Sequence, residues 1–395
     1  MRLGIIGAGQ SACTLVAELV RGQFKGEILV FNGELHRPYQ RPPLSKSWLK
    51  MLADTNIPSL LPEPIENHES IQWIKEWVTS IQPDSGELRT EKASYQVDQI
   101  VLATGTRARQ LTIEGLPPEI EHVIRTLDDA ERLRKHIQHA ENITIIGGSF
   151  LAFELAASLD HPDRVIRIVA RGNRLLPQVS VKTADRLLGS TTAFTQVDVQ
   201  IDSYDSNSKS LITNHGPVPA DLVIIAAGAV PNTEIAMRCG LGTVNGIATD
   251  LFMQTPHPKV SAIGEVSLHH QPHLGRSERV ESISEANDSA TTCAKRLLGH
   301  PEPFGAIPWF WSDQGQLKLQ IAGLCTGSDD ETCLISTNAD CVVIRHCGDR
   351  VTAIEAINAA REFMAARRLF ESGAISLSAL VEAGSVFDLL QSSRS

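Results

Sequence analysis

The sequence lacks a CxxC pair and any long tract of lysine and arginine. Its seven cysteines are scattered among 395 residues, which argues against a redox-active disulfide and against a cysteine-rich metal or iron–sulfur site. We expect them to be reduced thiols that mostly pack in the interior. The net charge of −10 argues against nucleic acid and anionic membranes as partners, so any basic contact site must be local.

The sequence also lacks an apolar run of transmembrane length, and we expect no cleavable leader. The opening MRLGIIGAG enters a strand at once, which predicts a cytoplasmic chain. What the sequence does contain is typical of a globular protein of two or three domains, with 42% hydrophobic and 21% charged residues and 28 glycines.

One pattern of an apolar strand, a glycine turn and a helix occurs twice. LGIIGAGQSACTLVAELV begins at Leu3, and its counterpart ITIIGGSFLAFELAASL begins at Ile143. Each copy is followed by another apolar strand, at 27–31 and at 165–169. The repeat predicts two βαβ nucleotide-binding folds and an α/β chain.

The first turn has the residues that a dinucleotide requires. Gly7 permits the tight turn, Gly9 lets the backbone approach a pyrophosphate, and Ala12 packs the helix against the strand. Such a turn also occurs as a plain connector between strand and helix. Likewise, LATGTRARQL at 102–111 and VSAIGEVS at 260–267 are ordinary strand ends when taken alone. Their order after GAGQSA favours a dinucleotide site.

Further motifs give the chain a resemblance to a known family. They are RPYQRPPLSK (37–46), RTLDDAERLR (125–134), GAVPNTEIA (228–236), ESISEANDSA (281–290) and PWFWSDQGQLKLQIAGL (308–324). Nearly the whole chain resembles the FAD-dependent, pyridine-nucleotide reductases that serve ferredoxins and rubredoxins in oxygenase and cytochrome P450 systems. The resemblance implies an FAD domain at 1–113 and 241–318, an NAD(P)H domain at 114–240 and a small α+β domain at 319–395.

The resemblance also implies a set of cofactor-binding residues. For FAD they are Gly7, Gly9, Ala12, Glu34, Arg41, Pro43, Lys46, Thr104, Gly105, Arg125 and Glu265, with Trp309 and Trp311 as candidate walls of the flavin or nicotinamide pocket. Aromatic residues more often anchor cores, which is the alternative for the two tryptophans. Glu265 stands where relatives have an aspartate that binds a ribityl hydroxyl. Its extra methylene, about 1.5 Å, would tilt or displace the flavin chain.

Lys46 and Glu154 are the predicted catalytic pair. In relatives the matching lysine stabilises electron density on the flavin ring, and the glutamate orients the lysine. The alternative is a surface salt bridge of little energetic value.

The second glycine turn departs from the pattern. Gly147 and Ala152 are in place, but Ser149 replaces the central glycine, and its Cβ would occupy the pyrophosphate's path. Ser149 would either weaken binding through its Cβ or donate a hydrogen bond from its hydroxyl to phosphate.

The strand after this turn bears on the choice of nucleotide. It ends in Ala170 rather than in an acid, and Arg171 and Arg174 follow. Guanidinium groups match a 2′-phosphate, so we favour NADPH over NADH, although most oxygenase-linked relatives prefer NADH. The alternative for Arg171 is a solvated strand end.

The resemblance implies hydride transfer from nicotinamide to flavin N5, followed by single-electron transfer to a [2Fe-2S] ferredoxin or rubredoxin-like carrier. Because such ferredoxins are acidic, Arg361, Arg367 and Arg368 on a predicted C-terminal helix would form the docking face. A helix that merely solvates itself is the alternative.

Two other functions remain open. One is a degenerate homologue that binds FAD and reacts poorly with nicotinamides, as a structural or redox-sensing subunit. The other is a reductase of oxygen or of a small organic acceptor. A histidine cluster, His269, His270 and His273, lies in a loop that contains a proline, which argues against a metal site there.

Overall fold

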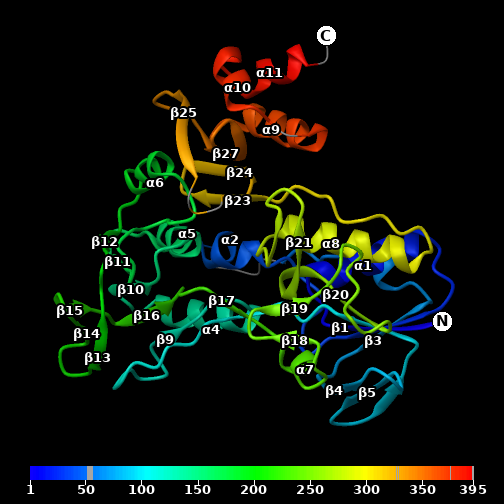
Figure 1. Ribbon diagram of the computed structural model, residues 1–395. Coiled ribbons are helices and arrows are strands. Elements are labelled where there is room, and N and C mark those ends of the chain that lie inside the picture. The colour runs from blue at the N-terminus through cyan, green and yellow to red at the C-terminus, as the bar shows by residue number, and fades with distance from the viewer. Residues whose placement is uncertain (51–56, 326, 328, 374, 394–395) are drawn as a thin grey trace. The chain divides into compact units, whose positions relative to one another are not determined.

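The computed structural model describes residues 1–50, 57–325, 327, 329–373 and 375–393 (Figure 1). The chain forms two compact units. The first comprises Met1–Gln40, Ile57–Arg107 and Val230–Phe310, and the second comprises the described residues of Arg41–Asn56, Ala108–Ala229 and Trp311–Ser395.

The first unit is built on a five-stranded parallel sheet in the order β20-β7-β1-β2-β3. These strands are β1 (Arg2–Ile6), β2 (Glu27–Phe31), β3 (Ile71–Ile74), β7 (Gln99–Leu102) and β20 (Val260–Ala262). Helices α1 (Gln10–Arg21) and α8 (Ile283–Leu297) pack together, and Leu3, Ile5 and Leu15 are fully buried in the core that α1 and β1 share. Burial of this apolar surface is the main stabilising contribution.

Smaller elements complete the first unit. One small sheet is antiparallel and consists of β4 (Val78–Gln82), β5 (Glu87–Thr90) and β6 (Ser94–Gln96). A second sheet has the order β18-β19-β21-β22, with β18 (Gly242–Thr243), β19 (Gly246–Ala248), β21 (Ser267–Gln271) and β22 (Arg276–Glu278). Its β19 and β21 are parallel, and its other pairs are antiparallel. The short helices are α3 (Glu63–Glu66), α7 (Glu234–Met237) and η2 (Gly264–Val266).

The second unit contains a parallel sheet of the same design, in the order β12-β11-β10-β16-β9. Its strands are β9 (Glu121–His122), β10 (Asn142–Ile146), β11 (Val165–Val169), β12 (Phe194–Gln196) and β16 (Leu222–Ile225). In both sheets the strand before the glycine turn is central and the strand after the following helix is its neighbour. The prediction of two βαβ folds is therefore confirmed.

Helices and an antiparallel layer surround this second sheet. The helices are η1 (Pro42–Ser45), α2 (Ser47–Lys50), α4 (Leu127–Ile137), α5 (Phe150–Leu159) and α6 (Val181–Leu188). The layer consists of β13 (Ile201–Asp205), β14 (Ser210–Thr213) and β15 (Gly216–Pro219). The chain passes between the two units within β8 (Thr106–Ala108), β17 (Ala229–Pro231) and β23 (Trp309–Gln314).

The C-terminal part of the second unit is a five-stranded sheet in the order β23-β24-β27-β26-β25, followed by three helices. Its other strands are β24 (Leu317–Gly323), β25 (Asp330–Ser336), β26 (Cys341–Cys347) and β27 (Arg350–Ile357), and the helices are α9 (Ala360–Ser372), α10 (Leu377–Ala383) and α11 (Val386–Ser392). This confirms the predicted α+β character of the C-terminal region. Among the residues that the structure describes, no helix combines the length and apolarity needed to span a bilayer.

Candidate functional site

The turn between β1 and α1 requires glycine at its first position. Gly7 has a φ of +110°, and a Cβ there would lie 2.2 Å from the carbonyl oxygen of Ala103. That separation is far below any real contact, so the neighbouring strand end leaves room for hydrogen alone.

The second position of the turn leaves open space. Gly9 is extended, and a Cβ placed on it would meet nothing within 4 Å. No side chain caps α1 and no acidic residue lies in its first turn, while Ala12 is fully buried. A helix N-terminus with free N–H groups and open space before it fits the diphosphate of FAD.

Thr104 and Gly105 form part of a tied turn in the same unit. The hydroxyl of Thr104 donates to the carbonyl oxygen of Asn232 at 2.7 Å, and the amide of Asn232 donates to the carbonyl oxygen of Thr104 at 2.9 Å. The backbone N–H of Asn232 also donates to Gly105 at 2.9 Å. Sequence reasoning missed Asn232, although it lies in the motif GAVPNTEIA at 228–236.

The carboxylate of Glu265 has a hydrogen-bond partner within the protein. Its Oε2 accepts a hydrogen bond of 2.8 Å from the Thr106 hydroxyl, and its backbone oxygen accepts one of 3.0 Å from Arg279. The carboxylate is thus oriented by Thr106.

Two other predicted residues of the first unit are similarly oriented. Glu34 follows β2, and its Oε2 accepts a hydrogen bond of 2.6 Å from Tyr39, another residue that the sequence reasoning did not single out. Trp309 is fixed through its backbone, since its N–H donates to the Ser284 hydroxyl at 3.0 Å and its carbonyl accepts from that hydroxyl at 2.7 Å.

The second unit brings Lys46 and Glu154 together. The Nζ of Lys46 lies 2.6 Å from Oε2 of Glu154, and the side chains are 22% and 8% exposed. Glu154 also accepts hydrogen bonds from Ser45 at 3.1 Å and from Ser312 at 2.8 Å. The pair is therefore shielded and its carboxylate is satisfied by three donors, which differs from the exposed salt bridge of the alternative interpretation. Sequence reasoning missed Ser45 and Ser312.

Arg41 and Arg125 are in contact within the same unit. Arg41 donates to the carbonyl oxygen of Arg125 at 2.7 Å, and Pro43 lies in η1 between Arg41 and Lys46. Arg125 precedes the capping box of α4, in which Thr126 and Asp129 satisfy each other's backbone N–H groups. Trp311 begins the part of β23 that belongs to this unit.

The second glycine turn repeats the first in geometry. Gly147 has a φ of +139°, and a Cβ there would lie 2.2 Å from the carbonyl oxygen of Ala226. Ser149 is extended at the start of α5 without capping it, and Ala152 is fully buried. The Ser149 hydroxyl instead accepts a hydrogen bond of 3.0 Å from the amide of Gln178, a residue that sequence reasoning missed.

The two arginines after β11 differ from each other. Arg171 is exposed, and no hydrogen bond or ion pair of its side chain occurs among the residues that the structure describes. Arg174 is half-buried and donates to the carbonyl oxygen of Val179. Ala170 is buried, so no carboxylate stands at the end of β11.

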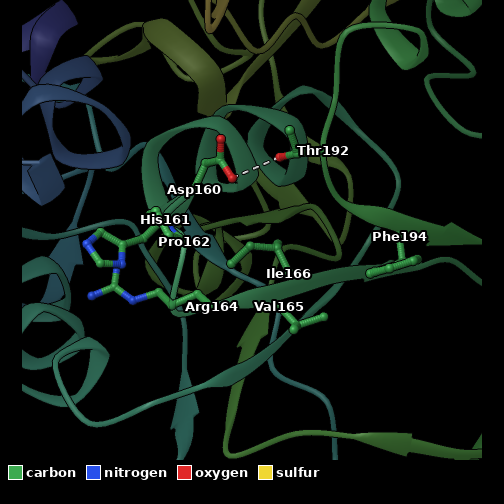
Figure 2. Close-up of a pocket in the computed structure, with 8 residues that line it drawn as sticks. All are labelled: Asp160, His161, Pro162, Arg164, Val165, Ile166, Thr192 and Phe194. Carbon is green, nitrogen blue, oxygen red and sulfur yellow. Dashed lines mark hydrogen bonds between the residues drawn. The ribbon is translucent and has the colours of Figure 1, made fainter.

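A surface pocket of about 380 Å³ lies elsewhere in the second unit (Figure 2). It is lined by residues 160–162 and 164–166, Thr192 and Phe194, and Thr192 donates to Asp160 at 3.0 Å. Val165 and Phe194 begin their strands, whereas the glycine turn follows the end of the parallel strand β10. The pocket is thus at the opposite edge of the sheet from the nucleotide turn.

The histidine cluster does not converge. His269 is buried against the ring of Phe304, with its Nε2 3.3 Å from a carboxylate oxygen of Glu285, whereas His270 faces the other side of β21 and is exposed. Burial lowers the pKa of His269 to about 4 and raises the pKa of Glu285 to about 8, which favours a neutral pair. No potential metal-binding cluster occurs in the described part of the chain.

All seven cysteines lie within the described residues and are free thiols. Burial raises the pKa of Cys13, Cys293 and Cys325, which makes these thiols poor nucleophiles.

The C-terminal helix α9 carries the three predicted docking residues. Arg361 and Arg368 are exposed, as is Met364 between them, while Arg367 is half-buried. The guanidinium of Arg361 lies 3.4 Å from the centroid of the Phe387 ring. An arginine held over an aromatic ring keeps its charge at the surface.

The two parallel sheets of the same design, the glycine turn in each of them and the shielded lysine–glutamate pair define a protein of two dinucleotide-binding folds. Comparison with known proteins agrees. A family model described as pyridine nucleotide-disulphide oxidoreductase matches residues 1–290, and one described as reductase C-terminal matches residues 309–389. The chain belongs to the pyridine nucleotide-disulphide oxidoreductase family.

Individual proteins similar to this chain over most of its length are reductases. Rhodocoxin reductase of Rhodococcus erythropolis is 30% identical, over 93% of this chain and 89% of its own length. The crystal structure of the ferredoxin reductase for the CYP199A2 system from Rhodopseudomonas palustris is 30% identical, with a TM-score of 0.91 over 99% of both chains.

A third relative was solved together with its partner. The covalent putidaredoxin reductase–putidaredoxin complex matches with 26% identity and a TM-score of 0.93, over 100% of this chain and 99% of that one. The resemblance inferred from the motifs is confirmed. The chain is an oxidoreductase whose cofactors are FAD and a nicotinamide dinucleotide.

Proposed function

We propose that the protein is an FAD-containing reductase that passes electrons from NAD(P)H to a [2Fe-2S] ferredoxin or rubredoxin-like carrier of an oxygenase system. The observation that carries the proposal is the combination of two dinucleotide turns with the shielded Lys46–Glu154 pair in one chain. The ferredoxin acceptor rests on the relatives, which are reductases named for such carriers or solved in complex with one.

The bound flavin supplies the change from two-electron to one-electron chemistry. The protein's part is to bind and orient. Glu154, satisfied by three donors, fixes the ammonium group of Lys46, which would face negative charge that builds up on the ring. Gly7, Gly9 and Ala12 would form the turn that binds the diphosphate, and Glu34, Thr104, Gly105 and Glu265 would bind the rest of the FAD. Arg41, Pro43, Arg125, Trp309 and Trp311 would line the ring.

We further propose NADPH as the preferred donor. Gly147, Ser149 and Ala152 would form the turn that binds the pyrophosphate at the start of α5. The exposed guanidinium of Arg171 and the absence of an acid at Ala170 support recognition of a 2′-phosphate. Arg174, already bonded to the backbone, would contribute its charge and less of its hydrogen-bonding capacity.

The exposed face of α9 would dock the ferredoxin, since Arg361 and Arg368 flank an exposed methionine, Met364. We propose that the chain consists of an FAD domain (1–113 and 241–318), an NAD(P)H domain (114–240) and a C-terminal domain (319–395). We place the protein in the cytoplasm.

A degenerate, nicotinamide-insensitive function is the second candidate. Ser149 supports it, because its side chain and that of Gln178 meet at the start of α5, where a pyrophosphate would bind.

An anaerobic titration of the flavoprotein with NADPH and, separately, with NADH tests both candidates. Bleaching of the flavin absorbance by either nucleotide supports the reductase and identifies its donor. A flavin that dithionite reduces and neither nucleotide reduces would overturn the reductase in favour of the degenerate homologue. Reduction of an added [2Fe-2S] ferredoxin, compared with reduction of oxygen alone, then identifies the acceptor.

A further inference from the structure

The loop between β11 and α6, residues 170–180, carries the two arginines of the proposed 2′-phosphate site. Backbone bonds fasten it along its length, since Leu176 donates to Gly148 at 2.7 Å and Asp198 donates to Gly172 at 3.0 Å. Leu176 has a φ of +49°, a left-handed conformation that a leucine keeps only where its surroundings impose it. The conformation of the loop therefore depends on its attachments.

The end of the loop is attached to the C-terminal sheet. Ser180 donates its backbone N–H to both carboxylate oxygens of Glu355, at 2.9 and 3.1 Å, and its hydroxyl to Oε2 at 2.6 Å. Glu355 lies on β27 and is fully buried. On the neighbouring side, Glu331 of β25 accepts a hydrogen bond of 2.9 Å from the N–H of Val181. Figure 1 shows α6 beside the strands of this sheet.

The attachment uses the first turn of α6, where helix N–H groups lack partners and the dipole favours negative charge. Ser180 completes the cap by accepting a hydrogen bond of 3.1 Å from Thr183. A cation faces the carboxylate of Glu355 as well, because Arg345 lies 3.5 Å away and is itself buried. Breaking such a buried arrangement is costly, so the attachment is rigid.

We propose that Glu355 is a positioning residue for the nicotinamide nucleotide. By fixing Ser180, it sets the loop that presents Arg171 to the ligand and brings Gln178 onto Ser149 of the glycine turn. The C-terminal sheet is thus part of the scaffold of the nucleotide site. This inference rests on the proposed function, because it assumes that the loop binds NAD(P)H.

The experiment compares Glu355→Gln with a matched control, Glu362→Gln. Glu362 lies on α9 and accepts hydrogen bonds from the N–H groups of Val386 and Phe387, at 2.7 and 3.1 Å, at the start of α11. It is thus a buried carboxylate in the same kind of contact, with no bond to the loop. The FAD-loaded proteins are titrated with NADP⁺, followed by the flavin absorption spectrum, and amide exchange of residues 170–180 is measured without nucleotide.

We expect Glu355→Gln to raise the Kd for NADP⁺ about tenfold, in line with the loss of one charged hydrogen-bond acceptor. Amide exchange at Leu176 and Val179 should become faster, while FAD content and reduction by dithionite stay at the wild-type level. Glu362→Gln should lower the melting temperature and leave both the Kd and the exchange of the loop unchanged.

Two results would overturn the inference: a wild-type Kd in Glu355→Gln, or an equal loss in Glu362→Gln. Should Glu355→Gln fail to fold, Ser180→Ala removes only the hydroxyl contact and should still weaken NADP⁺ binding by about threefold. A wild-type protein that binds neither NADP⁺ nor NAD⁺ would overturn the proposed function itself, a result distinct from normal binding in the variant.

Discussion

Replacing Gly9 by alanine should separate cofactor binding from folding. Gly9 caps α1 with a φ of −81°, which alanine adopts without strain, and a Cβ there meets nothing within 4 Å. Alanine at an N-cap costs about 0.5–1 kcal/mol relative to glycine, and the reduced freedom of the unfolded chain offsets about 0.4–1 kcal/mol of this. The free energy of unfolding of the flavin-free variant should therefore lie within about 0.5 kcal/mol of the wild-type value.

The same methyl group should impair FAD binding. It would project into the open space before α1, where the diphosphate must approach the helix N–H groups. Loss of one hydrogen bond to a charged oxygen costs about 1.5–3 kcal/mol, which corresponds to a Kd raised by about 10- to 150-fold.

Gly7→Ala is the matched control for this prediction. Its φ of +110° and the 2.2 Å approach to Ala103 should destabilise the protein by about 3 kcal/mol or more, even without FAD. Thermal unfolding of the flavin-free proteins measures stability, and quenching of flavin fluorescence measures affinity. The reasoning is refuted if Gly9→Ala binds FAD as tightly as the wild type, or if it is destabilised as strongly as Gly7→Ala.

The other predictions concern single side chains. Arg171→Ala should raise the KM for NADPH by about tenfold and that for NADH by less than about twofold, and equal effects on both in steady-state assays would contradict a 2′-phosphate contact. Glu154→Gln should retain FAD, but flavin reduction by NADPH should slow by about tenfold in stopped-flow experiments, because Lys46 loses its charged partner. An unchanged rate would mean that the pair has a structural role only. Charge reversal, Arg368→Glu, should slow ferredoxin reduction at low ionic strength and leave flavin reduction unaffected, and an unchanged rate would place docking elsewhere. Glu285→Gln should flatten the dependence of stability on pH between 6.5 and 8. Burial raises the pKa of Glu285 to about 8, so the folded protein keeps a proton that the unfolded chain releases, and wild-type stability should fall by about 1–2 kcal/mol as pH rises through this window. His269 contributes little in this window, because burial lowers its pKa to about 4 in the folded protein and the unfolded imidazole, with an ordinary pKa of about 6.5, is at most half protonated there. A wild-type melting temperature independent of pH would contradict the assignment.

The sequence predicted the backbone of the site better than the partners of its side chains. The glycine turns belong to a local strand–turn–helix pattern in which a positive φ requires glycine, so Gly7 and Gly147 were predictable, whereas the close approaches of Ala103 and Ala226 were not. Asn232 is 128 residues from Thr104, and Ser312 is 158 residues from Glu154, so no local pattern connects them. Hydrogen bonds of such sequence separation follow only from the tertiary fold.

The two departures from the family pattern were also recognisable from the sequence, whereas the partners of their side chains were not. At Glu265 and Ser149 the sequence identified a side chain longer than the family pattern in a position meant for a ligand, but it could not indicate what the polar group of that side chain would contact. The structure supplies an internal partner in each case, Thr106 for Glu265 and Gln178 for Ser149. A polar group that already has a partner must exchange one hydrogen bond for another when a ligand arrives, so the net cost or gain is small compared with a free group. Ser149→Gly should therefore change the Kd for NADP⁺ by less than about threefold when Gln178 is also replaced by alanine. In the single variant Ser149→Gly, the side-chain amide of Gln178 loses the hydroxyl to which it donates. Tighter nucleotide binding by the single variant would show that this amide donates to the phosphates instead. A large gain in affinity in the double variant would instead mean that the Cβ of Ser149 obstructs the pyrophosphate.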